Sequence, residues 1–174
     1  MQAARKTAHH AKCISQLRQI QMAMQSYSLE YKGCYPKTIE KDGDGRDLSS
    51  WRDAILSYVG MKKLITLKNS SSNSVFFCPI ALAEKTDADG NCVSTYAMNS
   101  HLSAFETSRV SAPSRTGVLM EGAYSNKTWY SSIGHNATSP GAPHKGKTHV
   151  SFVDGHVSAI TVPAERSDVF WSPE

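Results

Sequence analysis

The stretch that decides the fold is CISQLRQIQMAMQSYSLEY, residues 13–31. Its apolar side chains recur at spacings of 4, 3, 4, 3 and 4 residues, the period of one face of an α-helix. No glycine or proline interrupts residues 2–32, whereas Gly33 and Pro36 supply stop signals directly afterwards. We therefore predict a helix over residues 4–32, about 43 Å long, whose buried stripe consists of Cys13, Leu17, Ile20, Met24, Tyr27 and Tyr31.

The helix changes character before Cys13, because residues 3–12 carry basic and small side chains with almost nothing to bury. We expect these first turns to project beyond the globular body and to make few contacts with it, leaving a monomer or weak dimer in solution. An uncapped, basic helix start indicates that natural residues precede Met1. A frayed basic N-terminus is the alternative interpretation.

Composition excludes several classes of protein. A chain of 174 residues and 19.0 kDa fits one domain, and 40% hydrophobic with 20% charged residues is typical of a globular protein. No apolar run approaches a membrane span, and no secretory signal is visible. The net charge is +4, but Arg5, Lys6 and Lys12 supply most of it and leave only +1 elsewhere. A nucleic-acid partner is therefore not expected.

The last third of the sequence predicts an antiparallel sheet. Residues 116–121, 148–153 and 156–162 are strand-like, and Asp154-Gly155 between the last two favours a type I′ hairpin turn. The expected register places Val153 opposite His156, Ser151 opposite Ser158 and His149 opposite Ile160. These pairs lie on one face of the hairpin. The opposite face is more apolar, and we expect it to pack on the long helix. It carries Val150, Phe152, Val157 and Ala159.

The middle of the chain gives weaker signals. We expect a loop over residues 33–50, a second helix over 51–67, and short strands over 75–78 and 94–98. The predicted fold is α+β, a long N-terminal helix packed on an antiparallel sheet. It is one domain that divides into a helix stem (1–32), a mixed middle (33–115), a C-terminal sheet (116–162) and a tail (163–174).

Four cysteines show no spacing typical of a zinc site. Cys78 and Cys92 flank a turn-rich stretch, and a bridge between them would stabilise the protein by about 3 kcal/mol. We predict that bridge, with two buried thiols in a reducing compartment as the alternative. Cys13 and Cys34 lie at opposite ends of the last five helical turns, too far apart to pair.

Two stretches resemble a known family. Cys13 to Ile20, followed by Tyr35-Pro36, resembles the segment after the membrane helix in type IV pilins and type II secretion pseudopilins. His144, nine further residues and then Asp154-Gly155-His156 resemble the C-terminal signature of the bacterial family with a prepilin-type cleavage/methylation segment.

The resemblance implies a membrane-anchored, exported protein of the periplasm or cell surface, held in the inner membrane before assembly. Its implied partners are other pilin-like subunits, which contact the N-terminal helix, and the inner membrane, reached through an upstream helix missing here. The basic cluster before Cys13 could also touch phospholipid head groups, with a solubilising helix end as the alternative; it comprises Arg5, Lys6, His9, His10 and Lys12.

Candidate chemistry is sparse. Nine intervening residues separate His144 from Asp154 by up to about 30 Å, so we expect a turn at Asp154-Gly155 and a hydrogen-bonding anchor at His144 rather than one metal site. No cofactor is expected. Some pilin relatives bind calcium in a loop, so a calcium site at Asp42, Asp44 and Asp47 is an alternative. The spacing of these residues does not match that of an EF-hand loop.

No motif of a hydrolase is present, so we do not expect an enzyme. The sequence favours a structural subunit, the periplasmic part of a pseudopilin-like protein. The alternative is a binding module for polysaccharide or protein displayed on the same anchor. It would use aromatic residues of the long 122–143 insertion, namely Tyr124, Trp129 and Tyr130.

Overall fold

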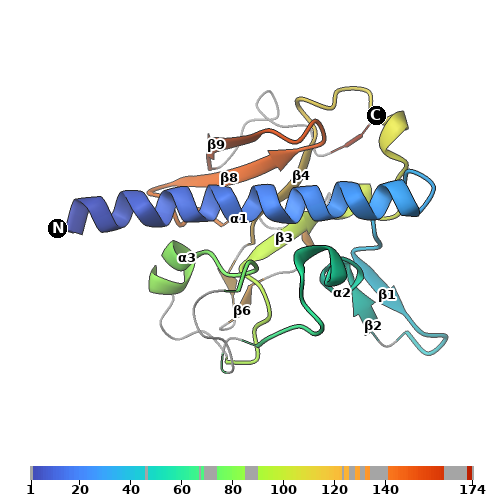
Figure 1. Cartoon of the computed structure of the whole chain (residues 1–174), viewed down its shortest axis with the longest axis horizontal. Helices are drawn as coiled ribbons and strands as arrows, with labels where there is room; N and C mark the ends of the chain where they lie inside the picture. Colours follow the sequence, from blue (N-terminus) through green and yellow to red (C-terminus); the bar gives the residue numbers. More distant parts are fainter. Residues whose placement is uncertain are drawn as a thin grey trace.

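Figure 1 shows a computed structural model of the chain, in which one long helix, α1, crosses the molecule in front of a twisted sheet. The structure describes residues 2–45, 47–66, 68, 74–84, 90–122, 124–125, 128–129, 132–133, 141–162 and 172–173, without the side chains of residues 2–6 and 124–133.

Helix α1 spans Gln2–Glu30 and confirms the predicted helix within two residues at each end. The first four members of the predicted stripe, Cys13, Leu17, Ile20 and Met24, are fully buried. The helix ends because Lys32 and Gly33 both adopt positive φ, and the Gly33 N–H donates to the Ser28 carbonyl at 2.8 Å. This is a Schellman-type C-cap.

The sheet behind α1 confirms the α+β fold. Four antiparallel strands lie in the order β3-β4-β8-β9, and a short strand, β7, pairs in parallel with the outer edge of β3. Their bounds are β3 Tyr96–Asn99, β4 Gly117–Glu121, β7 Ser132–Ile133, β8 Lys147–Phe152 and β9 Val157–Thr161.

The remaining elements are short. They are β1 Ile39–Lys41, β2 Asp47–Ser50, α2 Trp51–Ala54, η1 Ser57–Val59, α3 Pro79–Glu84, η3 Ser100–Leu102, η4 Thr107–Arg109, β5 Tyr124–Ser125 and β6 Thr128–Trp129.

Three expectations for the middle of the chain are wrong. The predicted loop 33–50 contains the β1–β2 hairpin. The predicted helix 51–67 stops after one turn, and left-handed Gly60 closes the 3-10 turn that follows it. Residues 75–78 form a turn rather than a strand, and Pro79 begins a helix instead of ending a strand. Proline suits the first helical position, because its missing N–H has no partner there in any case.

The hairpin turn lies where the sequence predicts, but its register is shifted by one residue. Val150 pairs with Ser158 and Ser151 with Val157. The Gly155 N–H donates to the Phe152 carbonyl at 2.9 Å, and Gly155 alone takes positive φ in this turn. The loop therefore has three residues, 153–155, with glycine in the left-handed position, instead of the expected two-residue type I′ turn.

The face of β8 that packs on α1 is also opposite to the predicted one. Ser151 donates to the Gln21 side chain of α1 at 3.1 Å, and Val153 belongs to the core that α1 buries. Val150 and Phe152 lie in a separate apolar cluster on the other side of the sheet. The drier face does not cover the helix, because α1 itself buries polar side chains such as Gln21 that need partners.

We expect Gly155→Val to lower the free energy of unfolding by about 1–3 kcal/mol, because Gly155 has φ +93° and a β-branched residue is strained there. Chemical denaturation measures the loss. Gly43→Val is the matched control: a Cβ at Gly43 meets nothing within 4 Å and φ is not positive, so its effect should stay within about 0.5 kcal/mol. Equal stabilities of the two variants would contradict the turn.

Candidate functional site

The most unusual group in the described part of the core is Glu121, the last residue of β4, which is 0% exposed. Its Oε2 accepts from the Thr148 hydroxyl at 2.6 Å and from the His149 backbone N–H at 2.5 Å. Its Oε1 lies 2.9 Å from His144 Nε2 and 3.3 Å from His149 Nδ1. Four donors therefore surround one buried carboxylate.

This arrangement keeps Glu121 ionised. Burial by itself raises the pKa of a carboxyl group, but the hydrogen bonds from His144 and His149 and their charge outweigh it and lower the pKa of Glu121 to about 2. A carboxylate in this state only accepts hydrogen bonds. Glu121 consequently fixes the orientation of both histidine rings.

A third imidazole joins the group from α1. The His10 ring lies 4.6 Å from that of His144 and 6.0 Å from that of His149, centroid to centroid, and the rings of His144 and His149 are 4.0 Å apart. His10 is half-buried. The expectation that residues 1–12 make few contacts with their own domain is therefore wrong at His10.

A disulfide borders this cluster and corrects the predicted pairing. Cys13 of α1 is bonded to Cys78, and their Cα atoms are 5.2 Å apart. The predicted Cys78–Cys92 bridge is wrong: the stripe of α1 carries Cys13 onto Cys78 at the start of α3, while Cys92 is buried elsewhere in the same core. Cys34 is a partly exposed thiol. The Cys78 sulfur lies 3.7 Å from His144 Nε2.

The family-signature residues do not form one site. His144 precedes β8 and bonds to Glu121, whereas Asp154 and Gly155 make the turn after β8. His156 follows them, and its Nδ1 lies 2.6 Å from Asp154 Oδ1 on the exposed hairpin. His144 thus makes a buried hydrogen bond, as the sequence led us to expect, and the hairpin end is separate from it.

The proposed calcium loop is held by local turn contacts. The Asp44 N–H donates to Asp42 Oδ1 at 2.9 Å, and Asp47 forms an exposed ion pair with Lys41 at 3.3 Å. Among the residues that the structure describes, two groups of side chains lie close enough together to share a metal ion. They are His10/His144/His149 and Cys13/Cys78/His144. The three aspartates are in neither.

The aromatic candidates of the 122–143 insertion are only partly placed. Tyr124 and Trp129 are register partners in the β5–β6 pair. Tyr130 lies outside the described residues.

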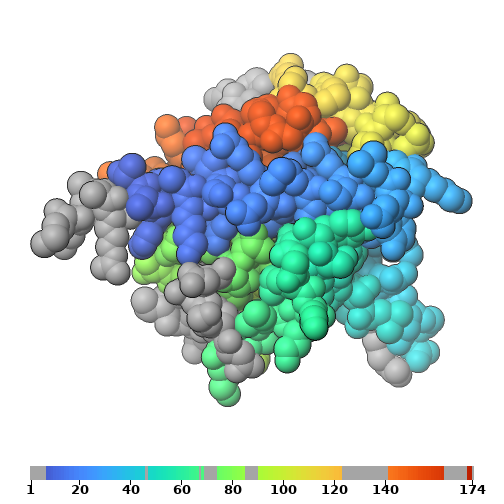
Figure 2. Space-filling view, viewed as in Figure 1, coloured from blue at the N-terminus to red at the C-terminus, as the bar shows by residue number. Residues whose placement is uncertain are grey.

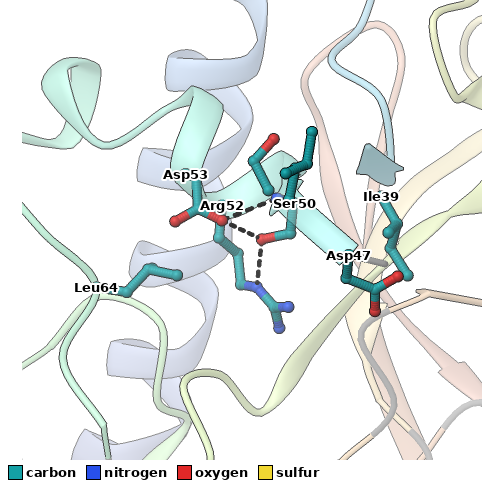
Figure 3. Close-up of a pocket in the computed structure, with 8 residues that line it drawn as sticks. Ile39, Asp47, Ser50, Arg52, Asp53 and Leu64 are labelled. Carbon is teal, nitrogen blue, oxygen red and sulfur yellow. Dashed lines mark hydrogen bonds between the residues drawn. The ribbon is translucent and has the colours of Figure 1, made fainter. Parts of the chain in front are cut away.

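An open pocket of about 250 Å³ lies apart from the histidines, between β2, α2 and Leu64 (Figure 3). There the Ser50 N–H and hydroxyl both donate to Asp53 Oδ2, at 2.8 and 2.7 Å, and Arg52 Nε donates to the Ser50 hydroxyl at 3.3 Å. Burial lowers the pKa of Arg52 to about 10. These bonds cap α2 and hold Arg52 beside the Trp51 ring, 5.6 Å from its centroid.

Sequence reasoning missed Glu121, His149 and His10 as members of one site. Glu121 ends an apolar strand, and a lone carboxylate in such a strand is a usable signal, because it must find donors when buried. His10 has no comparable signal, since it precedes the apolar stripe.

Comparisons with known proteins now give the family. The model of a family described as protein of unknown function (DUF1559) matches residues 2–116, well over half of the chain. The match stops before His144, so the His-(nine residues)-Asp-Gly signature stays a resemblance. No curated protein and no solved structure matches the chain. Across the described residues, no helix combines the length and the apolar character needed to span a bilayer. The chain belongs to the DUF1559 family, whose members are pilin-like proteins with a prepilin-type N-terminal segment.

Proposed function

We propose that this chain is the extracytoplasmic part of a structural, non-enzymatic subunit that assembles with other pilin-like subunits through α1. A pilin-like family suggests an extracytoplasmic location. In this proposal the N-terminal end of α1, which extends past the sheet in Figure 1, faces the inner membrane before assembly.

The observation that carries the proposal is a pair of exposed large apolar side chains on the outward side of α1. Met22 is 58% exposed and Leu29 is 85% exposed. They are seven residues apart, so they lie on the same side of the helix. One and two heptads before Met22, the same side carries Ser15 and Ala8, whose short side chains let a second helix approach closely.

This outward face has no cover within the described part of the domain. The opposite side of α1 is occupied by the sheet and by α3. Figure 2 shows α1 lying uncovered along the visible surface, between the C-terminal hairpin and the middle of the chain. Met22 and Leu29 are the large apolar side chains that this side of α1 offers to a partner. Another pilin-like subunit, presenting its own α1, is the occupant that we propose.

Charge on this face should prevent assembly without unfolding the domain. We expect Met22→Glu combined with Leu29→Glu to reduce the amount of full-length protein in the sheared surface fraction by about tenfold or more. A tenfold loss corresponds to about 1.4 kcal/mol, and burying an unpaired carboxylate in the contact costs more than that. Quantitative immunoblotting of that fraction measures the effect.

Leu48→Glu is the matched control, since Leu48 is 65% exposed but lies on β2, away from α1. It should assemble normally. Circular dichroism should give the same melting temperature for both proteins. Normal assembly of the double variant would refute the α1 interface.

A further inference from the structure

We propose that His10, His144 and His149 form a binding site for a divalent transition-metal ion, with Zn²⁺ as the best-fitting ion. The three residues come from α1, from the loop before β8 and from β8 itself. One ring nitrogen of each lies within 4.8 Å of those of the other two. Tetrahedral zinc with bonds of about 2.1 Å needs nitrogens about 3.4 Å apart, so small side-chain rotations close the site.

Glu121 already sets the two buried rings for metal binding. Its Oε1 lies 2.9 Å from His144 Nε2 and 3.3 Å from His149 Nδ1, and a carboxylate oxygen is an acceptor, so this geometry assigns the hydrogens to those two nitrogens. In the neutral rings the lone pairs are then on His144 Nδ1 and His149 Nε2. A carboxylate that accepts from the far nitrogen of a histidine is the usual outer partner of a metal ligand, because it orients the ring and raises its basicity.

An independent observation points to a missing ligand. His144 Nδ1 is buried and has no hydrogen-bond partner among the described residues, although the residue is only 5% exposed. A buried polar atom without a partner costs about 1–3 kcal/mol. A metal ion bound at this nitrogen would remove that cost.

The donor set selects the class of ion. Three imidazoles suit zinc, copper and nickel, whereas calcium and magnesium require oxygen ligands. His10 is half-buried, so solvent reaches the edge of the site, and a water molecule is the usual fourth ligand of a three-histidine zinc ion. The nearby Glu121 carboxylate partly compensates the positive charge. Bound metal would join α1 to β8 close to the Cys13–Cys78 disulfide.

The second group of potential metal ligands, Cys13/Cys78/His144, would bind metal under different redox conditions. Its two sulfurs are bonded to each other in the disulfide, so it becomes available only after reduction. The three-histidine site is complete with the disulfide intact. The redox state therefore distinguishes the two sites.

The test is a Zn²⁺ titration of chelator-treated, oxidised protein by isothermal calorimetry. We expect one Zn²⁺ per chain and a higher melting temperature in its presence. His10→Ala should weaken binding by about 100-fold or more, since loss of even an outer partner typically costs 10–100-fold. His10 is half-buried, so this variant should keep the fold, as circular dichroism of the metal-free protein verifies.

His9→Ala is the matched control, because His9 is the neighbouring histidine of α1 and is not part of the cluster. It should bind Zn²⁺ as the unmodified protein does. Equal affinity of the His9→Ala and His10→Ala variants would overturn the proposal. So would the lack of a stoichiometric site in the oxidised protein, or binding that appears only after a reductant is added.

Discussion

Glu121→Gln should lower the free energy of unfolding by about 3–5 kcal/mol, the largest effect that we expect from a single substitution. The amide has nearly the shape of the carboxylate but cannot accept from all four donors that converge on Glu121. Each buried donor left without a partner costs about 1–3 kcal/mol, and removing the charged member of a buried network is costlier than removing both members.

Urea denaturation at pH 7 measures this loss, which corresponds to a melting temperature lower by about 10 °C or more. The control is Glu40→Gln, which removes an exposed glutamate that contacts Lys37 at 3.1 Å. An exposed ion pair is worth about 0–1 kcal/mol, so the control should change little. If Glu121→Gln is as stable as Glu40→Gln, the buried network is not formed as described.

Removal of the Cys13–Cys78 disulfide should lower the free energy of unfolding by nearly as much as Glu121→Gln. Replacing Cys13 and Cys78 by alanine opens a link between residues 65 positions apart in the chain. The chain-entropy estimate for a loop of that size is about 4 kcal/mol. Both cysteines are fully buried, so lost packing adds to the effect.

Denaturation of the double variant measures this effect, with Cys34→Ala as a control that leaves the disulfide in place. Peptide mapping after alkylation without reductant should find Cys34 modified and Cys13 joined to Cys78. A peptide containing Cys78 linked to Cys92 would contradict the structure and restore the pairing expected from the sequence.

The sequence predicted those elements whose signals are local. The apolar period of residues 13–31 located α1, and Asp154-Gly155 located the hairpin turn within one residue. The register was wrong because Asp-Gly also fits a three-residue loop, in which only the glycine takes positive φ. The face of β8 that packs on α1 is a separate error, because Ser151 meets the buried Gln21 side chain of α1 while Val150 and Phe152 cluster on the other side of the sheet.

The candidate site could not be predicted because it depends on contacts distant in sequence. His10 and His144 come into contact only when α1 lies on the sheet, and the local sequence around either residue does not predict this contact. The cysteine pairing failed for a similar reason. The short loop between Cys78 and Cys92 favoured that pair by proximity, while the partner that α1 supplies lies 65 residues earlier.

The most direct test of assembly through the outward face of α1 is site-specific photocross-linking of the full-length protein in the cells that produce it. A photoreactive side chain at position 22 should form a covalent product with another pilin-like subunit, identified by mass spectrometry. The same group at position 48 should not, because Leu48 lies on β2, away from α1. No subunit product at position 22, or the same product from both positions, would contradict the account.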